Sequence, residues 1–166
     1  MKSYMTVMLI SATVLLIPNT AQSNNHQSSL YQQLLNMDQI LFEQSFNRCK
    51  QDVLEPVIAE DFEFYHDVAG VQNRAEFLKA VEKNICSTPD RKPIRKLVSN
   101  SLKVFPLKNN GKLYGAIQQG EHEFFIKEPN KALYKTSVAR FTHLWVLTDD
   151  QWQLKRVLSY DHQSPE

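Results

Sequence analysis

The last long stretch of the chain, Lys135–His162, constrains the fold more than any other feature. It reads KTSVARFTHLWVLTDDQWQLKRVLSYDH, two alternating runs on either side of Asp149-Asp150. This pattern predicts a β-hairpin in which Leu147 pairs with Trp152. Side chains alternate between the two faces of a strand, so counting back from the turn gives the residues that share one face. The expected pairs are Trp145 with Leu154, His143 with Arg156, Phe141 with Leu158 and Ala139 with Tyr160.

This shared face is large and apolar, and it carries one polar pair, His143 and Arg156, in its middle. A buried apolar face with a few polar groups is typical of a ligand pocket. The opposite face is more apolar than a solvated sheet face usually is. We expect it to form a homodimer surface, and the alternative is a scatter of exposed apolar residues. The apolar residues on this opposite face are Val138, Leu144, Val146 and Val157.

The first 23 residues are typical of a secretory signal peptide. Lys2 precedes an apolar run from Met5 to Ile17, and small residues follow in Ala21-Gln22-Ser23. We expect cleavage after Ser23, with cleavage after Ala21 as one alternative and an uncleaved membrane anchor as another. Residues 24–28 then form a disordered leader before one domain at 29–163. The cleaved protein would have no membrane span and would be secreted.

Charge and cysteine content limit the possible functions. The full chain has 19 basic and 18 acidic residues, and cleavage removes one base, Lys2, so the mature chain is formally neutral. Because there is no basic run, nucleic-acid binding is not expected. Cys49 and Cys86 each follow a predicted helix, and an even number of cysteines in an exported chain predicts a disulfide between them.

The remaining segments predict an α+β protein. Apolar spacing indicates a long helix from Ser29 to about Cys49, and Asn73 with Glu76 is typical of a helix start. The chain then continues in alternating runs, which predict four strands in a meander. The expected strands before the closing hairpin are Asp61–His66, Ile94–Phe105 (ended by Pro106) and Leu113–Ile126, with turns at Asp67–Gly70 and Asn109–Gly111.

Three segments carry a resemblance to a known family: Ile58–Asp67, Leu113–His122 and Phe141–His162. With the order of elements, they make the chain similar to the nuclear transport factor 2-like superfamily. The last two resemble its exported SnoaL-like branch, often labelled domain of unknown function 4440. The resemblance implies a cone-shaped fold in which a curved antiparallel sheet wraps three helices around a pocket. It also implies dimers and a bacterial periplasmic location, and it implies no single reaction, since this fold hosts isomerases, dehydratases, cyclases and binding proteins.

Strand parity extends the polar set inside the predicted pocket. If a turn at Pro129-Asn130 pairs Ile126 with Leu133, alternate residues of the preceding strand join the inner face. The inward polar residues are then His66, Tyr114, Gln118, His122, His143, Arg156, Tyr160 and His162. We expect His66, Tyr114, Gln118, His122 and His162 to line a ligand pocket. His143 would be a base or acceptor kept neutral by Arg156, and Arg156 and Tyr160 would be anion or oxyanion donors.

These observations leave three hypotheses for function. The leading one is an exported protein that binds a small, largely apolar molecule in the cone cavity. The second is a lyase, isomerase or hydrolase that uses the His143, Arg156 and Tyr160 group. The third is a structural or interaction protein whose cavity is filled by its own side chains. No cofactor is implied, and no metal site is expected because no HxH or HExxH spacing occurs.

Overall fold

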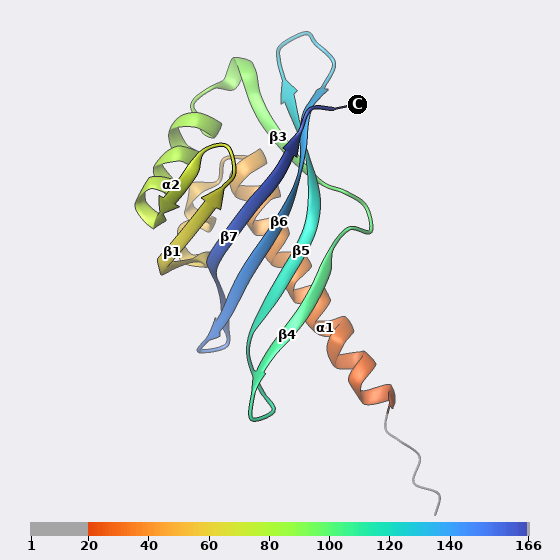
Figure 1. The fold of residues 1–166 in the computed structure, drawn as a ribbon. Coiled ribbons are helices and arrows are strands. Elements are labelled where there is room, and N and C mark those ends of the chain that lie inside the picture. Colours follow the sequence, from red (N-terminus) through yellow and green to blue (C-terminus); the bar gives the residue numbers. More distant parts are fainter. Residues whose placement is uncertain (1–19, 166) are drawn as a thin grey trace, which may run out of the picture.

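The computed structural model describes residues 20–165, and it shows one sheet with helices packed against one of its faces (Figure 1). The helix α1 (Thr20–Asp38) continues into the π-helical segment η1 (Gln39–Asn47). This helix begins before Ser29, so residues 24–28, expected as a disordered leader, are helical. The signal peptide predicted over residues 1–23 lies almost entirely outside the described residues. Among the described residues, no helix is both long and apolar enough to cross a membrane.

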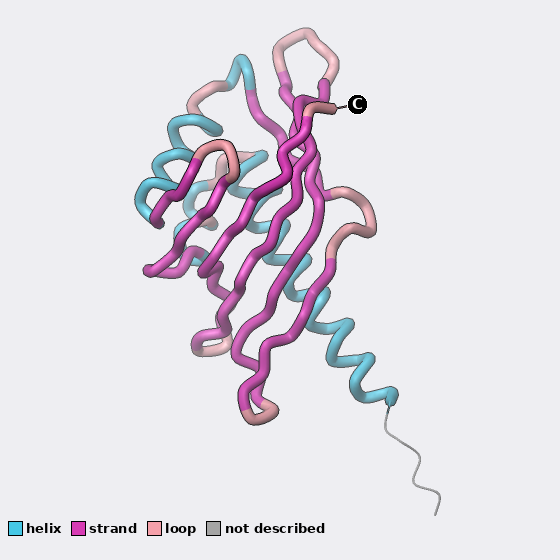
Figure 2. The backbone as a smooth tube through the Cα atoms, in the orientation of Figure 1, coloured by secondary structure: helices cyan, strands magenta, loops and turns pink. Residues whose placement is uncertain are grey.

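The described sheet has seven strands in the order β2-β1-β7-β6-β5-β3, with β4 also paired to β5 (Figure 2). The α+β class is confirmed, but the sheet is mixed, because β1 and β7 run parallel. Its strands are β1 (Ile58–His66), β2 (Gly70–Asn73), β3 (Lys92–Leu97), β4 (Lys103–Asn109), β5 (Lys112–Lys127), β6 (Tyr134–Thr148) and β7 (Gln151–Gln163). Short helical turns lie at Gln51–Val53, Glu55–Val57 and Pro89–Arg91.

The hydrophobic core fills the space between the sheet and the helices. The apolar stripe of α1 meets the inner face of β6 and β7, and Leu34, Trp145 and Leu154 are fully buried there. A second helical unit, α2 (Arg74–Ala80) followed by η4 (Val81–Cys86), covers β1. Asn73 and Glu76 form the predicted capping box at its start. The predicted disulfide between Cys49 and Cys86 is present, and it joins the ends of η1 and η4.

The hairpin of β6 and β7 has the predicted turn, but its register changes partway along. Leu147 pairs with Trp152 and Trp145 with Leu154, as expected. The next pair is Leu144 with Arg156, so Lys155 is an extra residue and forms a β-bulge. A one-residue shift turns every later side chain to the opposite face. The inward positions are therefore Val157 and Ser159, and the outward ones are Arg156, Leu158 and Tyr160.

A second bulge near the end of β7 reverses this change. Arg140 pairs with Tyr160 and Val138 with Gln163, so two residues of β7 lie opposite Ala139. Asp161 has a φ of 61°, which belongs to the left-handed region that Asp adopts more easily than most residues. The turn at Asp161 directs His162 back to the inner face. His162 therefore lies on the predicted face, although the register between the two bulges differs from the predicted one.

The segment predicted as one strand over 94–105 is two strands, β3 and β4. Pro106 lies inside β4, which pairs with β5 alone among the described strands. Proline is tolerated in an edge strand because its missing N–H would face away from the partner. A further register shift occurs where Leu107 pairs with Gly115 and Lys108 with Leu113. Tyr114 is the residue left over. Its side chain is exposed instead of lining the pocket.

Candidate functional site

A cavity of about 350 Å³ lies between the sheet and the helical units η1 and α2–η4. Its walls are mostly apolar and rich in phenylalanine. Phe42 and Phe46 come from η1, Phe77 from α2, Phe64 from β1 and Phe124 from β5. The four histidines expected on the inner face, His66, His122, His143 and His162, all line this one cavity.

The histidines form a continuous row of rings along one wall. His143 lies 4.5 Å from Phe141, and His122 lies 5.1 Å from the same phenyl ring, measured between ring centroids. The row continues from His122 through Phe124 to His162, and His162 stacks on His66 at 4.3 Å. His143 and His122 are buried, while His66 and His162 are partly exposed. The row therefore runs from the closed end of the cavity to its rim.

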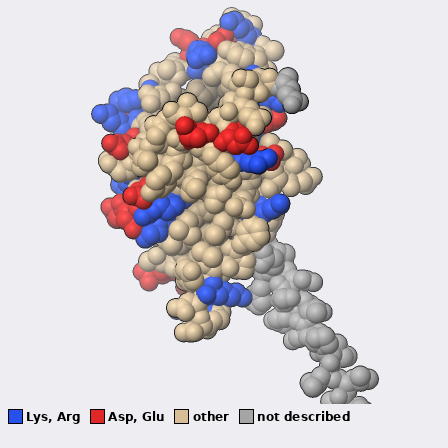
Figure 3. Space-filling model, in the orientation of Figure 1, with Lys and Arg blue, Asp and Glu red and all other residues tan. Residues whose placement is uncertain are grey.

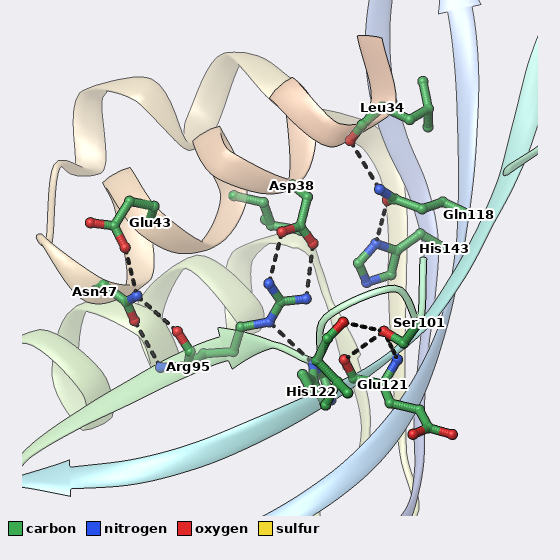
Figure 4. A network of polar contacts seen from close by, with 12 residues as sticks. Leu34, Asp38, Glu43, Asn47, Arg95, Ser101, Gln118, Glu121, His122 and His143 are labelled. Atoms are coloured by element: carbon green, nitrogen blue, oxygen red, sulfur yellow. Dashed lines mark hydrogen bonds and ion pairs between the residues drawn. The ribbon is translucent and has the colours of Figure 1, made fainter. Parts of the chain in front are cut away.

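At the closed end, a hydrogen bond to Gln118 fixes which nitrogen of His143 carries the proton (Figure 4). The Gln118 side-chain amide donates to the Leu34 carbonyl at 2.9 Å, and its oxygen accepts from the Trp145 indole N–H at 2.8 Å. That oxygen also lies 3.1 Å from His143 Nδ1. Since an amide oxygen only accepts, Nδ1 must carry the proton. His143 Nε2 is left as an acceptor, and this buried atom has no hydrogen-bond partner among the described residues.

His122 has the opposite arrangement because its partner is Arg95 of β3. The Arg95 guanidinium lies over the Phe42 ring at 3.8 Å and binds both oxygens of Asp38, at 2.7 and 2.9 Å. Its Nε donates to His122 Nδ1 at 3.5 Å (Figure 4). A guanidinium can only donate, so the proton of a neutral His122 is on Nε2. That buried N–H likewise has no hydrogen-bond partner in the part of the chain that the structure describes.

Both buried histidines are neutral at physiological pH. Burial, followed by the charge of Arg95, lowers the pKa of His143 to about 3 and that of His122 to about 2. Arg156 was expected to be the positive neighbour that keeps His143 neutral. In the structure that neighbour is Arg95. An unpaired buried donor or acceptor costs about 1–3 kcal/mol. The closed end of the cavity therefore contains one acceptor and one donor whose unpaired burial costs free energy. A ligand that forms hydrogen bonds to both would remove this cost.

At the rim, Asp67 holds His162. The parallel pairing of β1 with β7 brings them together, and Asp67 Oδ1 lies 2.5 Å from His162 Nδ1. Burial acts to raise the pKa of Asp67, but hydrogen bonds from the backbone and ring of His162 outweigh it and keep that pKa below its ordinary value. The carboxylate accepts a hydrogen bond from Nδ1–H, which leaves His162 Nε2 as the ring nitrogen that can accept a hydrogen bond. Ser159 Oγ lies 3.5 Å from that nitrogen.

His66 stacks on His162 but is held differently. Its Nδ1 accepts from the backbone N–H groups of Val68 and Ala69, both at 3.1 Å. Burial and the nearby His162 lower the pKa of His66, and Asp67 partly opposes them. The neutral ring therefore carries its proton on Nε2.

His66, Asp67 and His162 are close enough to be considered as metal ligands, since one ligand atom of each lies within 4.8 Å of the others. However, His66 Nδ1 is already occupied by two backbone donors. Binding a metal through Nε2 would move the proton to Nδ1 and lose both bonds. Parallel stacked rings also do not direct their in-plane lone pairs at one point. We therefore assign no metal to this group.

Two of the three predicted catalytic residues do not reach the cavity. Arg156 points outward from β7, where it pairs with Glu63 at 2.9 Å and donates to the Asp61 carbonyl. Tyr160 is 37% exposed on the same face. The predicted pair of His143 and Arg156 is wrong because the Lys155 bulge separates them. Gln118 is buried as expected, but it orients His143 and does not line the cavity itself.

Sequence reasoning missed Asp38 and Arg95, which are 4% and 3% exposed. A signal for Asp38 was present, since it lies four residues after Leu34 and three before Leu41 in the apolar stripe of the first helix. A charged residue on a buried helical stripe needs a partner of opposite charge. The partner could not be named, because Arg95 is far away in sequence and its strand was predicted with the wrong limits.

The outer face of the sheet is the face seen in Figure 3, and a broad part of it shows no charged side chain. Val157 was expected on this outer face, but the Lys155 bulge turns its side chain into the core. Leu158 takes the outward position and is 42% exposed. The predicted homodimer through this face concerns a second copy and stays a prediction.

Comparison with solved structures identifies the fold. No family model matches the sequence, and no curated protein matches it. ActVI-ORFA from Streptomyces coelicolor is similar over 81% of this chain and 98% of its own, with a TM-score of 0.63 and 14% identity. A nuclear transport factor 2-like superfamily protein from Salmonella enterica is similar over 84% of this chain and 93% of its own, with a TM-score of 0.60 and 13% identity.

A third similar structure, a nuclear transport factor 2-like protein from Cytophaga hutchinsonii, covers 76% of this chain and 93% of its own length. Its TM-score is 0.57 at 13% identity. The chain therefore has the nuclear transport factor 2-like fold, as its sequence predicted. At these identities the similarity establishes the fold alone. The narrower labels, SnoaL-like and domain of unknown function 4440, stay predictions.

Proposed function

We propose that this chain, which has the nuclear transport factor 2-like fold, binds a small, largely apolar molecule in the cavity between its sheet and helices. One observation carries the proposal: His143 and His122 line a phenylalanine-rich cavity, and each has a buried ring nitrogen with no hydrogen-bond partner within residues 20–165. Buried polar groups in proteins are nearly always hydrogen-bonded. A ligand that enters the cavity would provide the missing partners and bury its apolar surface against the walls.

Export is part of the same proposal. Disulfides persist mainly in oxidising compartments such as the bacterial periplasm and the extracellular space. The bond between Cys49 and Cys86 is compatible with such a location. The predicted signal peptide provides the route, with cleavage after Ser23 or Ala21.

Native mass spectrometry of protein exported with its own signal tests this function. We expect the mature chain to carry an additional small-molecule mass that is lost when the protein is denatured. His143→Phe should reduce or abolish the retained mass, because it removes the acceptor at the closed end. Arg156→Gln is the matched control, since this side chain faces away from the cavity. Equal retention in wild type and His143→Phe would contradict the proposed site.

A second candidate function, general-base catalysis, is supported by the pair of Asp67 and His162. A carboxylate that holds Nδ1–H keeps an imidazole in the tautomer whose Nε2 can take a proton. His143, the base expected from the sequence, is less suitable because a pKa of about 3 makes it a weak base. An isomerase or lyase of this kind would remove a proton from the carbon next to a carbonyl group.

Hydrogen–deuterium exchange tests the catalytic candidate directly. Tetralone, a bicyclic ketone, should exchange the protons next to its carbonyl faster in deuterated water when the protein is present. Asp67→Asn and His162→Gln should both remove the acceleration. If wild-type protein gives no acceleration although tetralone binds, the cavity is a binding site without this chemistry.

A further inference from the structure

We infer that the closed end of the cavity recognises an uncharged ligand that carries a hydroxyl group and a carbonyl group. The hydroxyl would donate to His143 Nε2, and the carbonyl oxygen would accept from His122 Nε2. This inference rests on the proposed binding function and narrows the class of ligand. It follows from the roles of the two nitrogens, which the surrounding side chains fix.

The acceptor role of His143 Nε2 rests on groups whose roles cannot be reversed. The Trp145 indole can only donate and the Leu34 carbonyl can only accept, and they hold the two ends of the Gln118 amide at 2.8 and 2.9 Å. If the Gln118 amide were flipped, its NH₂ group would face the Trp145 indole N–H and its oxygen would face the Leu34 carbonyl oxygen. Gln118 therefore presents an oxygen to His143, and His143 must donate through Nδ1.

The donor role of His122 Nε2 follows from Arg95. Two nitrogens of that guanidinium are occupied by Asp38, and its Nε–H points at His122 Nδ1. The reverse tautomer would place two N–H groups against each other. Both rings contact Phe141, with centroids 5.1 and 4.5 Å from it. A ligand that satisfies both nitrogens therefore carries its donor and its acceptor side by side at one end.

The electrostatics of this end argue against a charged ligand. A carboxylate could accept from His122 but would face the lone pair of His143, and the nearby cation, Arg95, is already paired with Asp38. An ammonium group could donate to His143 but would face the N–H of His122. Both charges would also lose water in a cavity whose walls are mainly apolar. A neutral hydroxy-carbonyl compound meets neither obstacle.

Calorimetric titration with a matched series of probes tests the inference on the intact protein. The series contains the isomeric phenolic tetralones, which vary the spacing between hydroxyl and ketone. It also contains their methyl ethers, which lack the donor, the corresponding phenols without the ketone, and the hydrocarbon tetralin. We expect at least one phenolic tetralone to bind about tenfold more tightly than its methyl ether and its ketone-free phenol.

Two variants assign these preferences to the two rings. In His143→Phe, the phenolic tetralone should lose its advantage over the methyl ether but keep its advantage over the ketone-free phenol. In His122→Phe, the reverse should hold. Because both preferences are also measured on wild-type protein, the test does not depend on either variant folding.

The outcomes separate this inference from the proposed function. If tetralin binds as tightly as every phenolic tetralone, the cavity is a binding site and the inference about its closed end is wrong. A charged analogue, such as tetralin carboxylate, binding more tightly than the neutral probes would also overturn it. If no probe binds, including tetralin, the proposed binding function fails as well.

Discussion

Gln118 of β5 and His143 of β6 lie directly opposite each other, and the hydrogen bond between their side chains determines the chemistry of the cavity. It places the His143 proton on Nδ1 and leaves Nε2 as a buried acceptor. Arg95 has the converse effect on His122. Two histidines on one wall thus present opposite hydrogen-bonding roles, although nothing in their own side chains distinguishes them.

The lowered pKa values predict that the fold loses stability in mild acid. His122, His143 and His66 all have pKa values below the ordinary histidine value of about 6.5. Below that pH the unfolded chain binds protons that the folded chain does not. Their contribution is therefore complete above about pH 6.5 and decreases as the pH falls towards about 3 for His143.

Urea unfolding between pH 7 and 4.5 measures this effect before most carboxylates titrate. Each fully buried neutral histidine should lower the free energy of unfolding by about 1.4 kcal/mol per pH unit below about pH 6, and by little above about pH 6.5. His143→Phe should reduce the slope by about one such increment. An unchanged slope in that variant would mean that His143 titrates normally in the folded protein.

Asp38→Asn should be strongly destabilising. The substitution leaves the Arg95 guanidinium buried without its counter-charge, and breaking such a pair costs about 3–5 kcal/mol. Glu43→Gln is a matched control one turn further along the same helical unit, because its ion pair with Arg48 is largely exposed and contributes less than about 1 kcal/mol. Urea unfolding gives both values. Equal effects of the two substitutions would refute the structural role of Asp38.

Loss of the disulfide should destabilise the fold by about 4 kcal/mol, because Cys49 and Cys86 close a loop with a sequence separation of 37. Thermal unfolding of Cys49→Ser/Cys86→Ser, compared with wild type under oxidising conditions, measures the change. Under reducing conditions the two proteins should unfold at similar temperatures. A double variant as stable as oxidised wild type would show that the bond contributes little.

Arg156 and Tyr160 should be dispensable for ligand binding. Both side chains point away from the cavity, on the outer face of β7. We expect Arg156→Gln and Tyr160→Phe to bind the phenolic tetralones as wild type does, while His143→Phe loses the preference for the hydroxyl. A loss of affinity in Arg156→Gln comparable to that in His143→Phe would support the predicted pairing of these two residues instead.

The sequence predicts most of the fold because the relevant patterns are local. Alternation predicts the hairpin turn at Asp149-Asp150, and the capping box predicts the start of α2. The even number of cysteines, each at the end of a predicted helix, predicts the disulfide between Cys49 and Cys86. Parity also places His66, Gln118, His122 and His143 correctly. From Gly115 to Phe124, the β6 partners are displaced by two residues from the predicted register, and an even displacement leaves the faces unchanged.

The errors come from β-bulges, which alternation alone cannot reveal. The Lys155 bulge moves Arg156 and Tyr160 outward, and the register shift around Tyr114 exposes that residue. Asp161 adopts a positive φ and returns His162 to the cavity. Contacts between distant segments were also out of reach. The parallel pairing of β1 with β7, which joins Asp67 to His162, depends on the tertiary fold.

Nitrogen NMR of the histidine rings, recorded during titration with a phenolic tetralone, tests the central claim most directly. In the free protein we predict neutral rings, with the proton of His143 on Nδ1 and that of His122 on Nε2. Binding should shift the Nε2 resonances of both rings and leave both tautomers unchanged. Opposite tautomers in the free protein, or a bound probe that leaves both Nε2 resonances unmoved, would contradict the account.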